Sequence, residues 1–121
     1  MKTNESSENY LETILLLSRK LPVVRSVDIA NEMNFKKSSI SVAMKHLREK
    51  NLITVDNSGF IFLTDAGLEI AENTYEKHEF ISEWLEKIGV PADIAAEDAC
   101  RIEHVLSPES FSAIKEYVNS H

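Results

Sequence analysis

Three side chains that can bind a metal ion stand close together near the end of the chain: Cys100, Glu103 and His104. On a helix, residues at i, i+3 and i+4 share one face, so this thiolate, carboxylate and imidazole can approach the same ion. A transition-metal site generally takes four or more donors. The remaining ligands must come from another segment, and the candidates are Glu8, Asn9, Glu12 and His78.

The donor types indicate which metal such a site prefers. A thiolate combined with imidazole and carboxylate suits Fe²⁺, Co²⁺, Ni²⁺ or Zn²⁺ better than Mn²⁺, which prefers oxygen donors, although abundant Mn²⁺ can still dominate. Taken singly, each donor more often has a structural role, as a buried thiol, a hydrogen-bonded histidine or a solvated carboxylate. Their convergence favours ligation, and metal binding should weaken as the pH falls because thiol and imidazole must lose protons.

Composition limits the class of protein. The 121 residues are 43% hydrophobic with only three Gly and three Pro, which predicts an ordered, helical chain of one domain or two small lobes. The single cysteine excludes an intramolecular disulfide. No apolar run approaches the roughly 20 residues of a membrane span, and the first residues lack the apolar segment of a secretory signal. We therefore expect a cytoplasmic protein without a membrane part.

The charge is divided unevenly along the chain. Residues 1–63 contain nine Lys and Arg against seven Asp and Glu, whereas residues 64–121 contain four against thirteen. The net charge of −7 is therefore the sum of +2 and −9. A mildly basic first half can meet phosphate, and an acidic second half favours cations or a partner, although acidic surfaces also simply aid solubility.

Apolar spacing in the first half predicts three helices and a β-hairpin. The helices are expected over Asn9–Leu21, from an N-cap at Ser26 to Asn34, and from an N-cap at Ser38. Two β-branched runs, 52–55 and 60–63, flank the turn signal at 56–59. Two short helices alone are more often an ordinary helical hairpin, but a following β-hairpin is the wing of a winged helix-turn-helix.

The second helix of this motif would contact DNA. Small hydroxyls and lysines reach phosphate readily, and its N-terminus has no Arg or Gln for a bidentate base contact, so affinity should depend strongly on salt. A single lysine such as Lys45 or Lys50 is more often merely solvated. The candidate DNA-binding residues are Arg25, Lys36, Lys37, Ser38, Ser39, Ser41, Val42 and Lys45.

The second half reads as helices only. A long helix over 66–88 begins after capping residues Thr64 and Asp65, a second contains the cysteine cluster through Leu106, and a third covers Glu109–Val118. These helices are too short to fold comfortably alone, so we expect a homodimer. The predicted fold is mainly α, with a winged helix-turn-helix domain over 1–64 and a helical metal-binding and dimerisation domain over 65–121.

The ordered set of these motifs resembles a known family over nearly the whole chain. The family is that of the metal-dependent transcriptional repressors typified by the diphtheria toxin repressor and the manganese transport regulator, in its short, two-domain form. The matching stretches are Glu8-Asn9-Tyr10-Leu11-Glu12-Thr13-Ile14, Val24-Arg25-Ser26-Val27-Asp28-Ile29-Ala30, Leu63-Thr64-Asp65-Ala66-Gly67, Lys77-His78-Glu79, and Glu97-Asp98-Ala99-Cys100-Arg101-Ile102-Glu103-His104-Val105-Leu106-Ser107.

The resemblance implies a set of ligands. Glu12, His78, Glu103 and His104 match family ligands, and Cys100 matches the ligand of the iron-responsive branch. Asn9 departs from both branches, since an amide replaces an Asp or a Met. Ser82 and Ala96 replace a Glu and a His of the iron branch's ancillary site, and the manganese branch would need carboxylates at 9 and 100. The resemblance therefore implies one metal per subunit, in a mixed nitrogen, oxygen and sulfur shell.

The implied function is metal-responsive repression. A homodimer loaded with Fe²⁺ or Mn²⁺ would bind a palindromic double-stranded operator of metal-uptake genes, while Zn²⁺, Co²⁺ or Ni²⁺ would bind in vitro, and no organic cofactor is expected. The alternative is a winged-helix regulator that senses an organic ligand or thiol oxidation at Cys100. An enzyme is not expected, because His78-Glu79 lacks the second histidine of H-E-x-x-H and no nucleophile motif or phosphate loop occurs.

Overall fold

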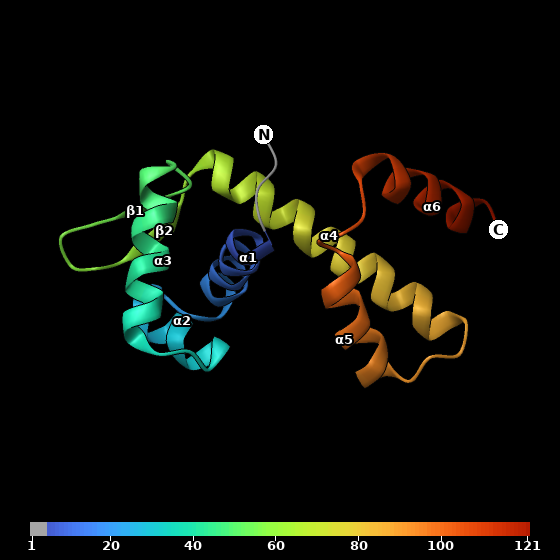
Figure 1. Cartoon of the computed structure of the whole chain (residues 1–121), viewed down its shortest axis with the longest axis horizontal. Helices are drawn as coiled ribbons and strands as arrows, with labels where there is room; N and C mark the ends of the chain where they lie inside the picture. The colour runs from blue at the N-terminus through green and yellow to red at the C-terminus, as the bar shows by residue number, and fades with distance from the viewer. Residues whose placement is uncertain (1–4) are drawn as a thin grey trace. The chain divides into compact units, whose positions relative to one another are not determined.

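The structure is a computed structural model that describes residues 5–121, and it contains two compact units that meet in sequence between Glu72 and Asn73 (Figure 1). The element order is α1 (Glu5–Lys20), α2 (Ser26–Met33), α3 (Lys37–Glu49), β1 (Ile53–Val55), β2 (Ile61–Leu63), α4 (Asp65–Lys87), α5 (Ala92–Ile102) and α6 (Pro108–Ser120). The predicted fold class, mainly α with one β-hairpin, is confirmed.

The first unit is built around an aliphatic core. Its three helices and the hairpin each bury apolar side chains, because the apolar positions of α1 and α3 recur at helical spacing and form one stripe per helix. Helix α2 contacts both α1 and α3. The buried apolar residues of this unit are Leu11, Ile14, Leu15, Leu17, Val24, Ile29, Ala30, Ile40, Met44, Leu47, Leu52, Ile53, Ile61 and, in the first turns of α4, Ala71.

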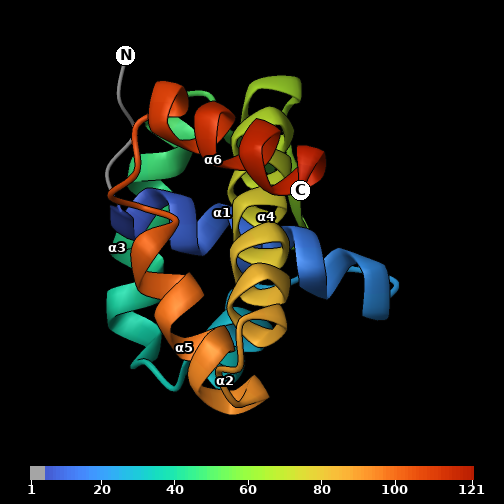
Figure 2. The same cartoon turned by 90° about the vertical axis from the view of Figure 1, so that its right-hand side faces the viewer.

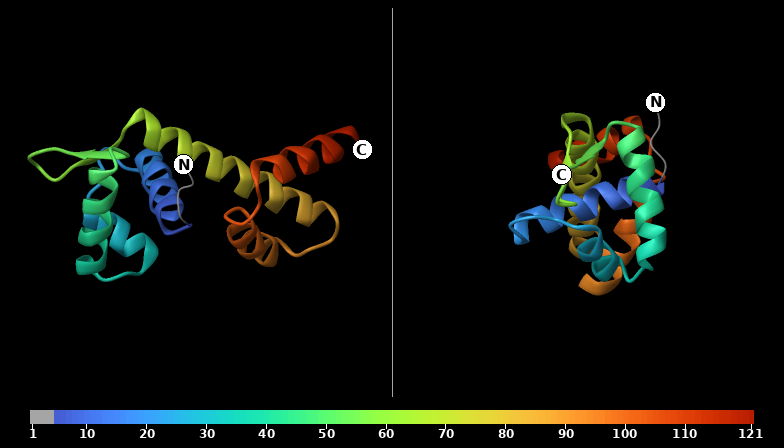
Figure 3. Two further views of the ribbon diagram at one scale, coloured as in Figure 1. Left: turned by 45° about the horizontal axis from the view of Figure 1, so that its top comes forward. Right: turned by 90° about the vertical axis from the view of Figure 1, so that its left-hand side faces the viewer.

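The hairpin that follows α3 forms the expected wing (Figure 3). Strands β1 and β2 pair antiparallel, with Thr54 opposite Phe62, and an isolated bridge joins Val24 to Ile61. In the turn, Asp56 Oδ1 accepts hydrogen bonds from the backbone N–H groups of Ser58 and Phe60, each at 2.9 Å. Gly59 has φ +82, so this turn uses a left-handed conformation that glycine adopts without strain.

Three helix starts in the first unit differ from the sequence predictions. Helix α1 begins at Glu5, four residues before the predicted Asn9, and ends at Lys20. Helix α2 has its N-cap at Arg25 and not at Ser26, because the Arg25 N–H donates to Asp28 Oδ2 at 2.9 Å and fixes the first turn one residue earlier. Helix α3 begins at Lys37 with Lys36 as N-cap, so Ser38 already lies inside the helix. At neither position does the hydroxyl supply the cap, and the chain instead enters each helix from an extended residue.

The start of α4 belongs to the first unit and packs closely on the wing. Thr64 Oγ1 accepts from the Gly67 N–H at 3.1 Å, so the predicted cap at Thr64 is present. A Cβ at Gly67 would lie 2.0 Å from the carbonyl oxygen of Leu52, which leaves room only for glycine. The structure thus divides at residue 72, and the division into domains 1–64 and 65–121 stays a prediction.

The second unit contains the rest of α4 with α5 and α6 (Figure 2). Its core is small and centres on Ile81, Ala99 and Phe111, around which Phe80, Leu85, Ile102 and Leu106 are partly buried. Gly89, at φ +108, ends the long helix, and Pro91 is the N-cap of α5. Ser107 Oγ accepts from the Ser110 N–H at 3.1 Å and caps α6.

The cysteine helix is shorter than predicted. It ends at Ile102 and not at Leu106, and Glu103 is its C-cap. Residues 103–105 form a turn, after which Ser107 and Pro108 start α6. In the described part of the chain, no helix has the length and apolar character needed to cross a membrane.

Candidate metal centre

The structure brings Cys100, Glu103 and His104 together at the end of α5. One ligand atom from each, the sulfur, a carboxylate oxygen and a ring nitrogen, lies within 4.8 Å of the others. Glu103 keeps helical angles, φ −56 and ψ −27, and its N–H donates to the Ala99 carbonyl at 3.0 Å. The three side chains therefore lie on one face, as their i, i+3, i+4 spacing predicted, although α5 itself ends at Ile102.

The Glu103 carboxylate is the most unusual group in this cluster. Its side chain is 0% exposed, and its two oxygens face two imidazoles: Oε2 lies 3.0 Å from His78 Nδ1, and Oε1 lies 3.2 Å from His104 Nε2. The His104 contact lacks hydrogen-bond geometry, so Oε1 has no hydrogen-bond partner among the described side chains of residues 6–121. Burying a carboxylate oxygen without a hydrogen bond is energetically unfavourable, so a group that binds this oxygen would stabilise the site.

These donors fit a divalent transition-metal ion. Metal–ligand bonds of about 2.0–2.3 Å keep donors on one ion no farther apart than about 4.6 Å, close to the spread seen here. An exposed thiol, a fully buried carboxylate oxygen and a histidine whose side chain is 1% exposed supply sulfur, oxygen and nitrogen. A cation here would satisfy the Glu103 oxygen that the protein leaves without a hydrogen bond.

His78 reaches the same carboxylate from α4. Its side chain is 27% exposed, and the Nδ1 contact with Glu103 links α4 to the end of α5 within the second unit. A histidine in this position can bind the ion directly, or it can hold the carboxylate in orientation as outer-shell partners of metal sites do. The second unit thus gathers four of the predicted donors.

The two remaining predicted ligands lie on α1, in the first unit. Asn9 and Glu12 stand three residues apart and therefore share a face of that helix. The Asn9 backbone carbonyl accepts a hydrogen bond from Thr13 Oγ1 at 2.8 Å. A threonine hydroxyl often bonds in this way to the carbonyl four residues earlier in a helix, so this contact does not distinguish Asn9 as a ligand. Their role as ligands, and that of the neighbouring Glu8, stays a prediction.

All eight predicted DNA-binding residues are exposed in the first unit. Arg25 and Lys36 are N-caps of α2 and α3, and the remaining six lie on α3. Val42 is 56% exposed and lies nearly opposite the buried stripe of Ile40, Met44 and Leu47.

Arg25 has a second partner that the sequence analysis missed. Its guanidinium lies 4.9 Å from the centroid of the Phe60 ring, next to the turn of the hairpin. A cation above an aromatic ring is attracted to the ring face, so Arg25 also ties α2 to the hairpin. The aromatic residue directly before β2, Phe60, is the sequence feature that could have predicted this contact.

A winged helix-turn-helix joined in sequence to a helical unit with a cluster of metal-binding side chains defines a metal-responsive, DNA-binding regulator. The chain belongs to the iron-dependent repressor family. Residues 2–59 match the family domain described as "Iron dependent repressor, N-terminal DNA binding domain". Residues 64–121 match the domain described as "Iron dependent repressor, metal binding and dimerisation domain". The predicted class of metal-responsive transcriptional regulator is confirmed, and neither the organic-ligand or redox alternative nor an enzymatic function has support.

Individual relatives agree with this family. The transcriptional regulator MntR of Escherichia coli O157:H7 is 29% identical over 97% of this chain and 76% of its own length. An uncharacterised helix-turn-helix-type transcriptional regulator of Methanocaldococcus jannaschii is 31% identical over 93% of this chain and 91% of its own length. The similarity therefore includes both halves of the chain.

Solved structures show the same fold. The manganese regulator SloR is 28% identical, with a TM-score of 0.83, and the match covers 98% of this chain and 55% of SloR. The IdeR of T. acidophilum is 26% identical, with a TM-score of 0.80, over 93% of this chain and 53% of IdeR. This chain thus spans about half the length of these two solved proteins.

Proposed function

We propose that this chain, loaded with Fe²⁺ or Mn²⁺, binds a palindromic double-stranded DNA operator as a homodimer in the cytoplasm and represses metal-uptake genes. Residues 1–64 would form the DNA-binding domain and residues 65–121 the metal-binding and dimerisation domain. The observation that carries the proposal is the buried Glu103 carboxylate, which lies between two imidazoles and beside a thiol in a chain that also contains a winged helix.

The proposed ligand set combines donors from both units. Cys100, Glu103 and His104 would bind one ion with His78, and Asn9 and Glu12 would complete the shell from α1. A bound divalent cation would supply the positive charge that offsets the buried carboxylate and the thiolate. The sulfur donor favours Fe²⁺, whereas the relative SloR is described as a manganese regulator, so a titration with both metals must decide between them.

Regulation follows from linkage between two binding equilibria. If metal binding favours the arrangement of the chain that binds DNA, metal and operator strengthen each other by the same factor, typically about 1–3 kcal/mol. Glu12 and Asn9 are the residues that would carry this coupling, because they alone among the proposed ligands belong to the DNA-binding unit.

The DNA contacts would come from the exposed face of α3. Lys36, Lys37 and Lys45 would meet phosphates, with the hydroxyls of Ser38, Ser39 and Ser41 beside them. Arg25 would contact phosphate from the N-cap of α2 while it stacks on Phe60. Val42 points outward between them and is the residue best placed for an apolar contact with a thymine methyl group.

The test is a DNA-binding titration of metal-free protein with Fe²⁺ under anaerobic conditions, Mn²⁺ and Zn²⁺, using operator sequences selected from a random pool. We expect metal to tighten DNA binding by about 5- to 150-fold, the usual range of allosteric coupling. Cys100→Ala should weaken the response to Fe²⁺ and Zn²⁺ more than the response to Mn²⁺, because Mn²⁺ gains little from a thiolate. Unchanged affinity with every metal would refute the proposal.

The proposed homodimer is tested separately, by the mass of the protein in solution. Sedimentation of the metal-loaded protein should give twice the mass of the chain, and one dimer should bind one operator with two half-sites about one helical turn apart. A monomer that binds a single half-site with full metal dependence would leave the metal response intact and contradict the dimer.

A further inference from the structure

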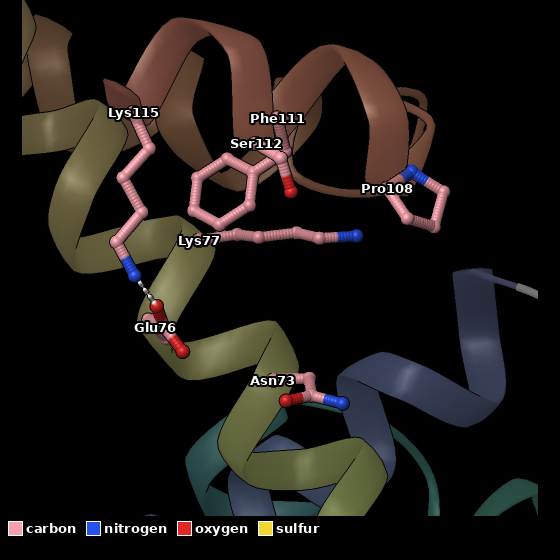
Figure 4. A pocket seen from close by; sticks show the side chains of 7 residues that line it. All are labelled: Asn73, Glu76, Lys77, Pro108, Phe111, Ser112 and Lys115. Atoms are coloured by element: carbon pink, nitrogen blue, oxygen red, sulfur yellow. Dashed lines mark hydrogen bonds and ion pairs between the residues drawn. The ribbon is translucent and has the colours of Figure 1, made fainter.

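A second site in the second unit lies between α4 and α6 and uses none of the proposed metal ligands (Figure 4). It is an open cavity of about 310 Å³. The residues that line it are Asn73, Glu76, Lys77, Pro108, Phe111, Ser112 and Lys115. They come from two helices and combine cations, neutral polar groups and an aromatic wall.

The charge of this cavity is opposite to that of its surroundings. Residues 73–121 contain four Lys and Arg against ten Asp and Glu, yet two of the four cations, Lys77 and Lys115, line this one cavity against a single carboxylate, Glu76. Lys115 is already engaged, because its Nζ makes an ion pair with Glu76 Oε1. The cavity therefore concentrates positive charge within an acidic unit.

Lys77 is the cation that has no counter-charge. Among the described side chains, those of residues 6–121, it makes no ion pair, and its Nζ lies 5.9 Å from the centroid of the Phe111 ring. Figure 4 shows the Lys77 ammonium directed away from Glu76 and toward Pro108, with the Ser112 hydroxyl on the side of the cavity along which the Lys77 side chain extends. Ser112 and Asn73 also make no side-chain hydrogen bond within the described residues, so three polar groups face the cavity without a protein acceptor.

Phe111 and Pro108 supply the apolar part of the lining. Phe111 belongs to the core of the unit and is only 8% exposed, so the ring is held firmly where it meets the cavity. Phe80 packs edge-on against it, with ring centroids 5.7 Å apart. Pro108 extends this wall without adding a hydrogen-bond donor on its backbone.

We propose that this cavity binds a small organic acid, with its carboxylate between the Lys77 ammonium and the Ser112 hydroxyl and its apolar body on Phe111 and Pro108. One unpaired cation matches one carboxylate, whereas a phosphate dianion would bring a second charge toward Glu76. Pockets of this kind hold ligands by apolar area and orient them by a few polar groups. The site is independent of the metal proposal, since none of its residues is a proposed ligand.

The test is a titration with benzoate of the 121-residue chain loaded with diamagnetic Zn²⁺, followed by amide chemical shifts. We expect a dissociation constant of about 1 mM or lower, with shifts centred on residues 73–77 and 108–115. Benzyl alcohol has nearly the same shape without the charge and should bind roughly tenfold more weakly, and inorganic phosphate should also bind more weakly than benzoate.

Three variants locate the binding. Lys77→Gln should weaken benzoate binding by roughly tenfold, and the matched variant Lys87→Gln, which removes a lysine from the same helix outside the cavity, should leave it unchanged. Glu76→Gln should tighten binding, because it removes the nearby negative charge and releases Lys115. A gain of affinity cannot arise from misfolding, so this variant keeps the test decisive if Lys77→Gln is unstable.

Other outcomes would overturn the proposal. No shifts up to about 10 mM benzoate would mean that the cavity is closed in solution or covered by a second copy of the chain. Equal losses in Lys77→Gln and Lys87→Gln would show only a general attraction of anions. Binding of benzyl alcohol as tight as that of benzoate would show an apolar cleft with no role for the lysine.

Discussion

The two units are stabilised in different ways. The first unit buries aliphatic side chains from three helices and a hairpin, and among its described charged groups Glu12 has one side-chain oxygen that is buried. The second unit has a core of Ile81, Ala99 and Phe111 and also buries the carboxylate of Glu103. Apolar burial is worth about 25 cal/mol per Å², whereas burying a carboxylate is costly until a cation or donor satisfies it. The first unit therefore relies mainly on apolar packing, whereas the second also buries a whole carboxylate that a bound cation would stabilise.

The largest effect is expected on stability, from a substitution that creates a cavity in the core of the first unit. Leu47→Ala should lower the free energy of unfolding by about 2–5 kcal/mol, because Leu47 is 1% exposed and the shorter side chain loses buried apolar contacts and leaves a cavity. Hydrogen exchange in α1–α3 should accelerate accordingly. The control is Val42→Ala on the same helix, which should change stability by less than about 0.5 kcal/mol. Equal effects of the two variants would show that the first unit has no specific core.

The second effect concerns the metal-binding cluster. Glu103→Gln keeps the shape but removes the charge, so we expect metal affinity to fall by more than about 100-fold, beyond the loss of an outer-shell partner. Because the variant no longer buries a carboxylate, the metal-free protein should be at least as stable as wild type in a urea titration. A variant that still binds metal normally, or that unfolds, would contradict the role assigned to this carboxylate.

His78→Gln separates a ligand from an orienting residue. If His78 only holds Glu103 in place, metal affinity should fall by about 10- to 100-fold and the metal spectrum should keep its shape, as for other outer-shell losses. If His78 is a ligand, the Co²⁺ absorption spectrum should also change, because one nitrogen leaves the shell. Neither change would mean that the 3.0 Å contact with Glu103 is incidental to metal binding.

A smaller effect is expected on the DNA-binding surface. Lys45→Gln should weaken binding similarly on all sequences and reduce the slope of log affinity against log salt by about 0.9 for each phosphate that the variant no longer neutralises. The matched control, Lys87→Gln in the second unit, should leave the slope unchanged. If both variants reduce it alike, the difference in charge between the two halves does not define the DNA-binding face.

The smallest effect is one of sequence preference. Replacing thymine by uracil at one position of each operator half-site should cost about 0.8 kcal/mol for wild type, the value of one buried methyl group, and nothing for Val42→Ser. Competition binding with the two operators measures the difference. An equal loss in both proteins would assign the methyl contact to another residue.

Local spacing predicted much of this structure. The helical stripes of α1 and α3, the turn signal at 56–59 and the cap at Thr64 all depend on residues close in sequence, and they appear as expected. The cluster at Cys100, Glu103 and His104 was predictable for the same reason, since three residues within one turn need no long-range information.

What the sequence did not reveal depends mainly on how the chain packs in three dimensions. Ser26 and Ser38 looked like N-caps, but a carboxylate contact at Asp28 and an extended residue at Lys36 place the helix starts earlier. The cavity beside Phe111 was not predicted either, because Lys77 and Lys115 are ordinary surface lysines until α4 and α6 are placed side by side. The boundary between the two units at residue 72 likewise depends on packing and not on composition.

The two glycines beside the wing have different consequences for how sequences of this protein can vary. At position 67 any Cβ would meet the Leu52 carbonyl at 2.0 Å, and all nineteen other amino acids have one. A saturation library at this codon, selected for folded protein, should therefore return glycine alone. At position 59 nothing lies within 4 Å and only the left-handed φ of +82 is demanding, so the same selection should also return Asn and Asp, which visit that region at little cost.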